Sequence, residues 1–170
     1  MRVFAVLFGL LWANLAMGAP EKMDNAIGSQ RKCGVGAVLG QPTGISGKCY
    51  FVGREFGWDA MVAWEFLNSR NGAMYIHTTA QWHPTEWEVE DLAHLSWYVG
   101  VGPYVALWFI EVPSWVNDSG VSVGVRAPIG LSFDFVDIPL QVFTEVSVNV
   151  GVFPSTRVGA GGGMGVRYYF

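Results

Sequence analysis

The chain has 170 residues, of which 51% are hydrophobic and only 14% are charged, with 22 glycines and a formal net charge of −4. Soluble domains usually carry about 25% charged residues, and nucleic-acid-binding domains have a basic surface, so this composition argues against both classes. After residue 20, no apolar run reaches the roughly 20 residues that a transmembrane helix needs.

The first residues have the composition of an export signal. Met1 and Arg2 form a short positive region, an apolar core follows from Val3 to Ala16, and small residues stand at Ala16 and Gly18. This pattern predicts a cleaved secretory signal peptide at residues 1–18, with an N-terminal membrane anchor as the alternative. Residues 19–31 are polar and lack periodicity, which predicts a flexible N-terminal arm. Residues 32–170 are expected to form one domain.

Apolar residues alternate with polar residues or glycine over most of this domain. Side chains alternate between the two faces of a strand, so the pattern predicts strands at residues 33–40, 45–51, 56–66, 74–83, 95–109, 121–135, 140–150 and 157–170. The segment Pro84–His94 is expected to be an acidic loop, and Glu111–Ser119 the longest outer loop. A bulge or other irregularity is expected at Pro103, because proline cannot donate a ladder hydrogen bond.

The alternating faces are long enough to cross a membrane, which takes about 9–11 residues per tilted strand. An even number of antiparallel strands is typical of bacterial outer-membrane proteins. The fold class predicted is therefore all-β, an eight-stranded antiparallel up-and-down transmembrane β-barrel. A soluble, lipocalin-like barrel with an apolar interior is the alternative.

The distribution of charged residues between the two faces of the strands indicates which face is inside the barrel. One parity is almost free of charge, so it is expected to meet lipid, because Arg or Lys facing lipid at the midplane costs about 2–4 kcal/mol. The other parity is expected to fill the lumen with a balanced ion-pair network of Lys48, Asp59, Glu65, Arg126, Asp134, Glu145, Arg157 and Arg167. A selectivity lining in a small pore is the alternative role for these residues.

The end of the chain adds a resemblance. Gly165, Tyr168 and Phe170 resemble the C-terminal signal of Gram-negative outer-membrane barrels, although Gly163 stands where a polar residue is usual. The segment Gly34–Gly44 looks like the first hairpin of a broad family of outer-membrane barrel proteins. The mature chain resembles small barrels of the outer membrane protein A and X kind. The resemblance implies export through the periplasm, residence in the cell outer membrane, and recognition by the assembly machinery.

The remaining candidate sites concern cysteine and histidine. Cys33 and Cys49 lie on the same parity of adjacent strands, so they are expected either to form a disulfide or to remain free thiols. His77 and His83 are expected to be packed, hydrogen-bonded lumen residues, because their spacing with His94 is not that of a metal site. We predict no catalytic, cofactor-binding or metal-binding residues and no cofactor.

The sequence therefore predicts a monomeric, non-enzymatic outer-membrane barrel with a structural or interaction role and a lumen closed by ion pairs. Its partners would be outer-membrane lipids and the assembly machinery, with no nucleic acid. A small pore is the alternative function. A lipid-modifying enzyme is a further alternative, since some eight-stranded barrels carry such activity. A hydrolase would need a nucleophile next to a base, and His77 lies mid-strand with no convincing serine partner.

Overall fold

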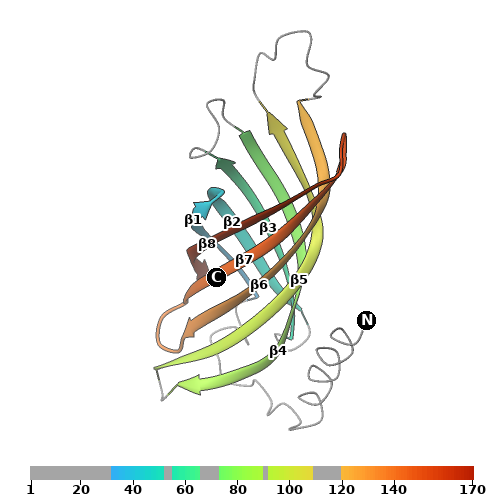
Figure 1. The fold of residues 1–170 in the computed structure, drawn as a ribbon. Helices are drawn as coiled ribbons and strands as arrows, with labels where there is room; N and C mark the ends of the chain where they lie inside the picture. The colour runs from blue at the N-terminus through green and yellow to red at the C-terminus, as the bar shows by residue number, and fades with distance from the viewer. Residues whose placement is uncertain (1–31, 52–54, 66–72, 90–91, 109–119) are drawn as a thin grey trace, which may run out of the picture.

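The computed structural model describes residues 32–51, 55–65, 73–89, 92–108 and 120–170. These contain β1 (Cys33–Gln41), β2 (Thr43–Phe51), β3 (Phe56–Glu65), β4 (Ala73–Val89), β5 (Ala93–Trp108), β6 (Val121–Phe135), β7 (Leu140–Phe153) and β8 (Arg157–Tyr169). Each strand pairs antiparallel with the next, and β8 pairs with β1 to close the barrel (Figure 1). The predicted eight-stranded antiparallel barrel is thus confirmed.

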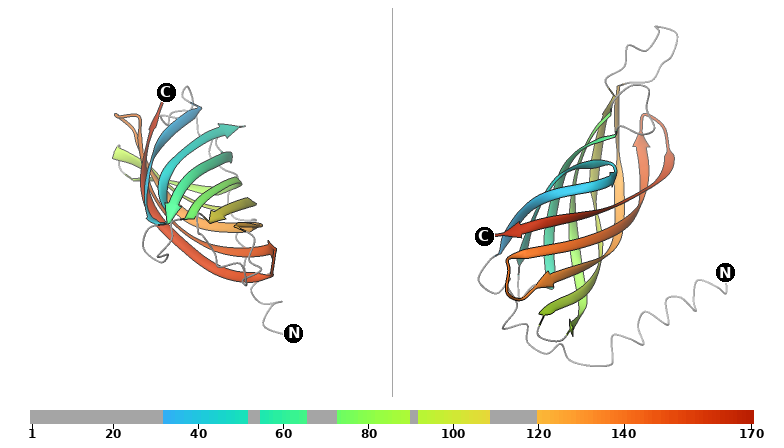
Figure 2. Two further views of the ribbon diagram at one scale, coloured as in Figure 1. Left: turned by 90° about the horizontal axis from the view of Figure 1, so that it is seen from above. Right: turned by 90° about the vertical axis from the view of Figure 1, so that its left-hand side faces the viewer.

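Several predicted segments lie outside the described residues, namely the signal peptide at 1–18, the arm at 19–31 and the outer loop at 111–119. In the part of the chain that the structure describes, no helix has the length and apolar character needed to cross a membrane. The strands are inclined to the barrel axis, as the two views of Figure 2 show.

The two faces of the strands are those expected from the alternation. Val146 and Val166 point outward and are 61% and 46% exposed, whereas Arg126 points inward and is 3% exposed. Interior side chains fill a barrel of this size, so the lumen has a mixed core. A small apolar cluster of Val38, Met61, Ala63 and Phe143 lies among buried polar residues.

The prediction of an acidic loop at Pro84–His94 is wrong. The structure continues β4 to Val89 and begins β5 at Ala93, so most of this segment is a hairpin extension of the barrel. Pro84 lies where the β4–β5 register shifts between Trp82 and Thr85. A proline is tolerated at such an irregularity because the regular ladder does not require a donor there.

Of the bulge or other irregularity expected at Pro103, the structure shows an interruption of strand pairing and no bulge. Pro103 pairs with Val125 of β6, and the register of β5 with both neighbours is the same before and after it. Pairing with β4 is interrupted opposite Pro103 and resumes at Ala80 without a shift. The missing N–H therefore removes a rung of the ladder without adding a residue to the strand.

The barrel has two ends of different character. We call the end that holds the start of β1 and the last residue, Phe170, the terminal rim, and the opposite end the distal rim. At the terminal rim the Phe170 amide donates to the Cys33 carbonyl, with an N–O distance of 3.0 Å. Strand lengths vary widely, since β1 and β2 have 9 residues each while β4 has 17. The rims are consequently uneven.

Candidate functional site

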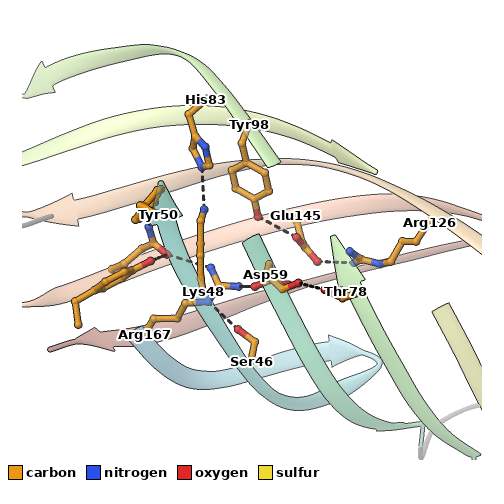
Figure 3. Close-up of polar contacts among 12 residues, drawn as sticks. Ser46, Lys48, Tyr50, Asp59, Thr78, His83, Tyr98, Arg126, Glu145 and Arg167 are labelled. Carbon is orange, nitrogen blue, oxygen red and sulfur yellow. Dashed lines mark hydrogen bonds and ion pairs between the residues drawn. The ribbon is translucent and has the colours of Figure 1, made fainter. Parts of the chain in front are cut away.

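The lumen holds a connected set of charged and polar side chains contributed by β2 through β8 (Figure 3). Strand alternation aims every second residue of each strand at the barrel axis, so residues distant in sequence meet there. Six charged residues are buried, namely Lys48, Arg126 and Arg167 with Asp59, Asp134 and Glu145. Three positive and three negative charges balance, so this buried set is formally neutral.

Arg167 of β8 organises the part of this network nearer the terminal rim. Its Nη2 donates to Asp59 Oδ2 at 2.5 Å, its Nε to Ser46 Oγ at 2.7 Å and its Nη1 to Gln141 Oε1 at 3.0 Å. The guanidinium carbon also lies 3.7 Å from the centre of the Phe143 ring. The planar guanidinium is thus held along both its edges and one face, which fixes its position between strands.

Gln141 of β7 connects this arginine to further residues. Its Nε2 donates to Asp134 Oδ1 at 2.8 Å and to Tyr50 Oη at 2.9 Å. Its Oε1 accepts from Tyr169 Oη at 3.1 Å as well as from Arg167. An amide offers donors at one atom and acceptor sites at the other, so Gln141 can join a carboxylate to a guanidinium.

A second ion pair lies between β6 and β7. Arg126 Nη2 donates to Glu145 Oε1 at 2.5 Å, and Tyr98 Oη donates to Glu145 Oε2 at 2.9 Å. Both carboxylate oxygens of Glu145 are therefore occupied. A buried carboxylate needs such partners, because an unpaired buried charge is strongly destabilising.

Lys48 of β2 is enclosed by rings. Its Nζ lies 2.8 Å from His83 Nε2, and 4.6 and 4.7 Å from the ring centres of Tyr50 and Tyr98. An ammonium group can only donate, so His83 Nε2 is the acceptor of this hydrogen bond when Lys48 is charged. Cation–π contacts replace part of the hydration that the ammonium loses on burial.

Two residues of the predicted network are not in this buried set. Arg157 is exposed, because β8 begins there beyond the last residue of β1 that pairs with it, which is Gln41 opposite Gly162. The side chain of Glu65 lies outside the described part of the chain. The other six predicted residues are brought together.

Sequence reasoning missed several members of the network, among them Gln141, Tyr98 and Ser46. All share the inward parity of their strands, and this was the signal that could have indicated them. Parity alone does not give the contacts, because these depend on which strands face each other across the lumen.

The three histidines make different contacts. His83 is hydrogen-bonded as expected, and His94 Nδ1 lies 3.5 Å from Glu86 Oε1. His77 departs from the expectation: it is buried, but neither ring nitrogen has a hydrogen-bond partner among the described residues. It packs edge-on against Tyr75, with 6.0 Å between ring centres. No cluster of His, Cys, Asp and Glu that could hold a metal ion occurs among the described residues.

Cys33 and Cys49 are directly opposed in the register of β1 and β2. Their Cα atoms are 4.1 Å apart and their sulfur atoms are bonded, so the structure contains the disulfide rather than two free thiols. The bond lies at the terminal rim, where it joins the first residue of β1 to the second strand.

Of the residues of the predicted assembly signal, Gly165 and Tyr168 lie near the end of β8, and Phe170 directly follows its last residue. Tyr168 and Phe170 are exposed on the outer surface, whereas Gly165 faces the lumen. A Cβ added at Gly165 would lie 2.6 Å from ring atoms of Phe143 and from the Ala37 carbonyl oxygen. This glycine therefore makes room for a lumen side chain from β7.

Comparison with known proteins supports the architecture. No protein-family model and no curated protein matches the chain. Among solved structures, the chain is similar to the crystal structure of the N-terminal β-barrel domain of Pseudomonas aeruginosa OprF. The TM-score is 0.62 at 14% sequence identity, and the match covers 83% of this chain and 98% of that one. At this identity the likeness concerns the fold alone, and at that level it confirms the resemblance to small eight-stranded outer-membrane barrels.

Proposed function

We propose that the chain is an integral outer-membrane β-barrel with a structural or interaction role, and that its lumen is closed to ions. The observation that supports closure is the network around Arg167, Gln141 and Glu145. It joins residues of β2, β3, β5, β6, β7 and β8 and occupies both oxygens of Glu145. A passing ion would have to break several charge-assisted hydrogen bonds at once.

The membrane location is supported by the outer surface. Large apolar side chains are exposed on all eight strands, for example Ile45, Ile129 and Val148. An apolar surface that surrounds the whole molecule is far larger than a soluble monomer exposes. Exposed aromatic residues near the terminal rim, such as Phe51, Phe56 and Phe170, suit the level of the lipid headgroups. Assembly by the outer-membrane machinery, as a monomer, belongs to the same proposal.

The test is to fold the purified protein into lipid vesicles and into planar bilayers. Folded barrels migrate differently on gels before and after heating, and vesicle flotation measures insertion. We expect heat-dependent mobility, co-flotation and no steady channel. A reproducible ohmic conductance from the folded protein would contradict closure and favour the small-pore alternative, while failure to float would contradict the membrane location.

A catalytic role would require a base beside a nucleophile. The buried histidine His77 has no hydroxyl partner at either ring nitrogen among the described residues. We therefore propose a non-enzymatic role, and lipid mass spectrometry of membranes with and without the gene tests it. A change in acyl composition that follows the gene would show the opposite.

A further inference from the structure

Strand β4 continues well past β3 at the terminal rim. β3 pairs with β4 only as far as Trp82, and the His83 amide then donates to the Glu55 carbonyl at 2.7 Å. From Thr85 to Val89, β4 pairs with β5 on one side, and no strand in the described part of the chain pairs with its other edge. The β4–β5 hairpin therefore extends from the barrel with one open edge, and Figure 1 shows it reaching further than its neighbours at the lower end.

This extension lies beyond the part of the barrel that crosses the hydrocarbon. β3 has 10 residues, which at about 3.4 Å per residue and a tilt of about 40° rise roughly 26 Å. The apolar band of such barrels is about 25 Å tall, with aromatic residues at its limits. Phe56 and Trp82 are paired at the terminal-rim end of β3, so they suit that limit. Trp87 lies roughly 13 Å further along β4, which exceeds the roughly 5–8 Å of the headgroup region and places it in water.

The two faces of the extension carry different side chains. Glu86 and Glu88 lie on the inner face, opposite Ser96 and His94 of β5. Glu86 Oε1 is 3.5 Å from His94 Nδ1, and Glu88 is exposed. Trp87 lies on the outer face and is 49% exposed. A large apolar side chain that is exposed in water beside charged residues is typical of a protein-binding surface.

The sequence around the open edge is acidic. Residues 84–94 contain four Asp or Glu residues, and no Lys or Arg occurs between Arg70 and Arg126. Opposite charges on neighbouring strands attract one another, and like charges are destabilising. Charged residues on an edge also oppose pairing with strands that carry no complementary charge. The edge therefore favours a basic strand over a neutral or an acidic one.

We propose that the open edge of β4 binds an extended basic segment of another polypeptide by strand addition. Backbone hydrogen bonds attach such a segment to the edge, and its alternate side chains determine specificity. The positions beside Glu86 and Glu88 would carry Lys or Arg, two residues apart. The residue between them, beside Trp87, would be apolar. The proposal deepens the proposed interaction role, on which it rests, by naming the chemistry of the partner.

The chain itself does not contain such a segment. Nowhere in its 170 residues are two basic residues separated by a single residue. In the segment 19–31, the residue two positions after Lys22 is Asp24, and Arg31 has no basic residue two positions away. Neither this segment nor a second copy of the chain therefore offers the alternation that the edge favours, so the occupant is a different polypeptide.

The test measures the binding of synthetic peptides by fluorescence anisotropy. The full mature chain is folded in micelles of a neutral detergent, so that both rims are accessible and no anionic lipid competes for the peptide. The probe is a labelled peptide in which lysine and valine alternate. We expect it to bind about tenfold more tightly than a peptide with glutamate in place of lysine, or one with all its lysines grouped at one end.

Two further peptides test the backbone contacts. One carries N-methyl groups on all its lysine amides and the other on all its valine amides. Only one of these two sets of amides faces the edge of β4 in a paired strand, because successive amides point to opposite sides. Methylation of that set should weaken binding about tenfold, and methylation of the other set should leave it unchanged.

Two charge reversals test the position of the peptide. Glu88→Lys should weaken binding of the lysine peptide about tenfold and strengthen binding of the glutamate peptide. Asp137→Lys is the matched control, because Asp137 is exposed in the turn between β6 and β7, and β5 separates that turn from the open edge. At 0.15 M salt, where charges more than about 8 Å apart are screened, this control should leave both affinities unchanged.

Heat-dependent mobility is measured first for each variant, and flotation tests the membrane location separately, so the failure of one proposal is distinguished from the failure of the other. The proposal is overturned if the folded wild type does not bind the lysine–valine peptide, or binds the grouped-lysine peptide equally well. Equal effects of Glu88→Lys and Asp137→Lys would also overturn it. Binding that appears only after removal of residues 19–31 would show that the chain's own segment covers the edge, which contradicts the proposal.

Discussion

Removing one charge of the Arg126–Glu145 pair tests whether the lumen network stabilises the barrel. Glu145→Gln keeps the size of the side chain but leaves the buried guanidinium without a counter-charge. The carboxylate accepts from Arg126 at 2.5 Å and from Tyr98 at 2.9 Å, and both bonds lose their ionic partner. Breaking a buried pair by removing one partner costs about 3–5 kcal/mol.

The measurement is urea unfolding of the barrel in vesicles, followed by tryptophan fluorescence. With a slope of about 2 kcal/mol per molar urea, the loss corresponds to a midpoint lower by roughly 1.5–2.5 M. Glu88→Gln, at an exposed carboxylate, is the matched control and should leave the midpoint unchanged. The double variant Arg126→Met with Glu145→Gln should recover most of the loss, because no unpaired charge remains.

If the urea midpoint of Glu145→Gln differs from that of the wild type by no more than the midpoint of Glu88→Gln does, the reasoning is refuted. Equal losses for the single and the double variant would also refute it, because they would mean that side-chain shape and not charge pairing matters at this position. The unfolding and refolding curves must coincide for the free energies of the variants to be comparable.

The following predictions concern other parts of the molecule. Gly165→Ala should lower the unfolding free energy by about 1–3 kcal/mol, because the added Cβ would lie 2.6 Å from an aromatic ring, whereas Gly159→Ala, with nothing within 4 Å, should be neutral in the same urea assay. Cys33→Ser with Cys49→Ser should cost about 3 kcal/mol, since the bond closes a loop of 16 residues, and the reduced wild type should unfold at the same urea concentration as this variant. Phe170→Ala should reduce the amount of barrel recovered from the outer membrane in cells while leaving refolding of the purified protein into vesicles intact, and equal losses in both assays would show a stability effect instead.

Much of the architecture follows from the alternation of residue types. The period of two assigns Val146 and Val166 to the outside and Arg126 to the lumen without any knowledge of strand pairing. Balanced charge on the inner parity likewise predicts that the lumen charges meet one another. The face on which a side chain lies depends only on its own strand, so the sequence predicts it well.

The partners of each lumen residue could not be predicted in the same way. Arg167 contacts Asp59, which is 108 residues away, because closure of the barrel brings β8 opposite β3 across the lumen. That contact depends on the register of every strand pair between them, and a one-residue slip in any of them would change it. Nothing in the sequence distinguishes Gln141 from the other polar residues of the same parity.

The error at Pro84 has a local cause. Proline usually ends a strand, so the acidic residues after it resemble a loop. The structure shows that β4 continues past Pro84 to Val89, because the β4–β5 register shifts between Trp82 and Thr85 and accommodates the proline. The error at His77 is of another kind, because its partners would have to come from other strands.

The disulfide has a consequence for the order in which the barrel forms. Its two cysteines belong to the first hairpin, and the residues between them complete that hairpin. On the proposed export route through the oxidising periplasm, we therefore expect this crosslink to form before β8 has paired with β1. β1 is then already held in its final register with β2 when β8 arrives. The last step of barrel closure is therefore the pairing of β8 with the fixed edge of β1.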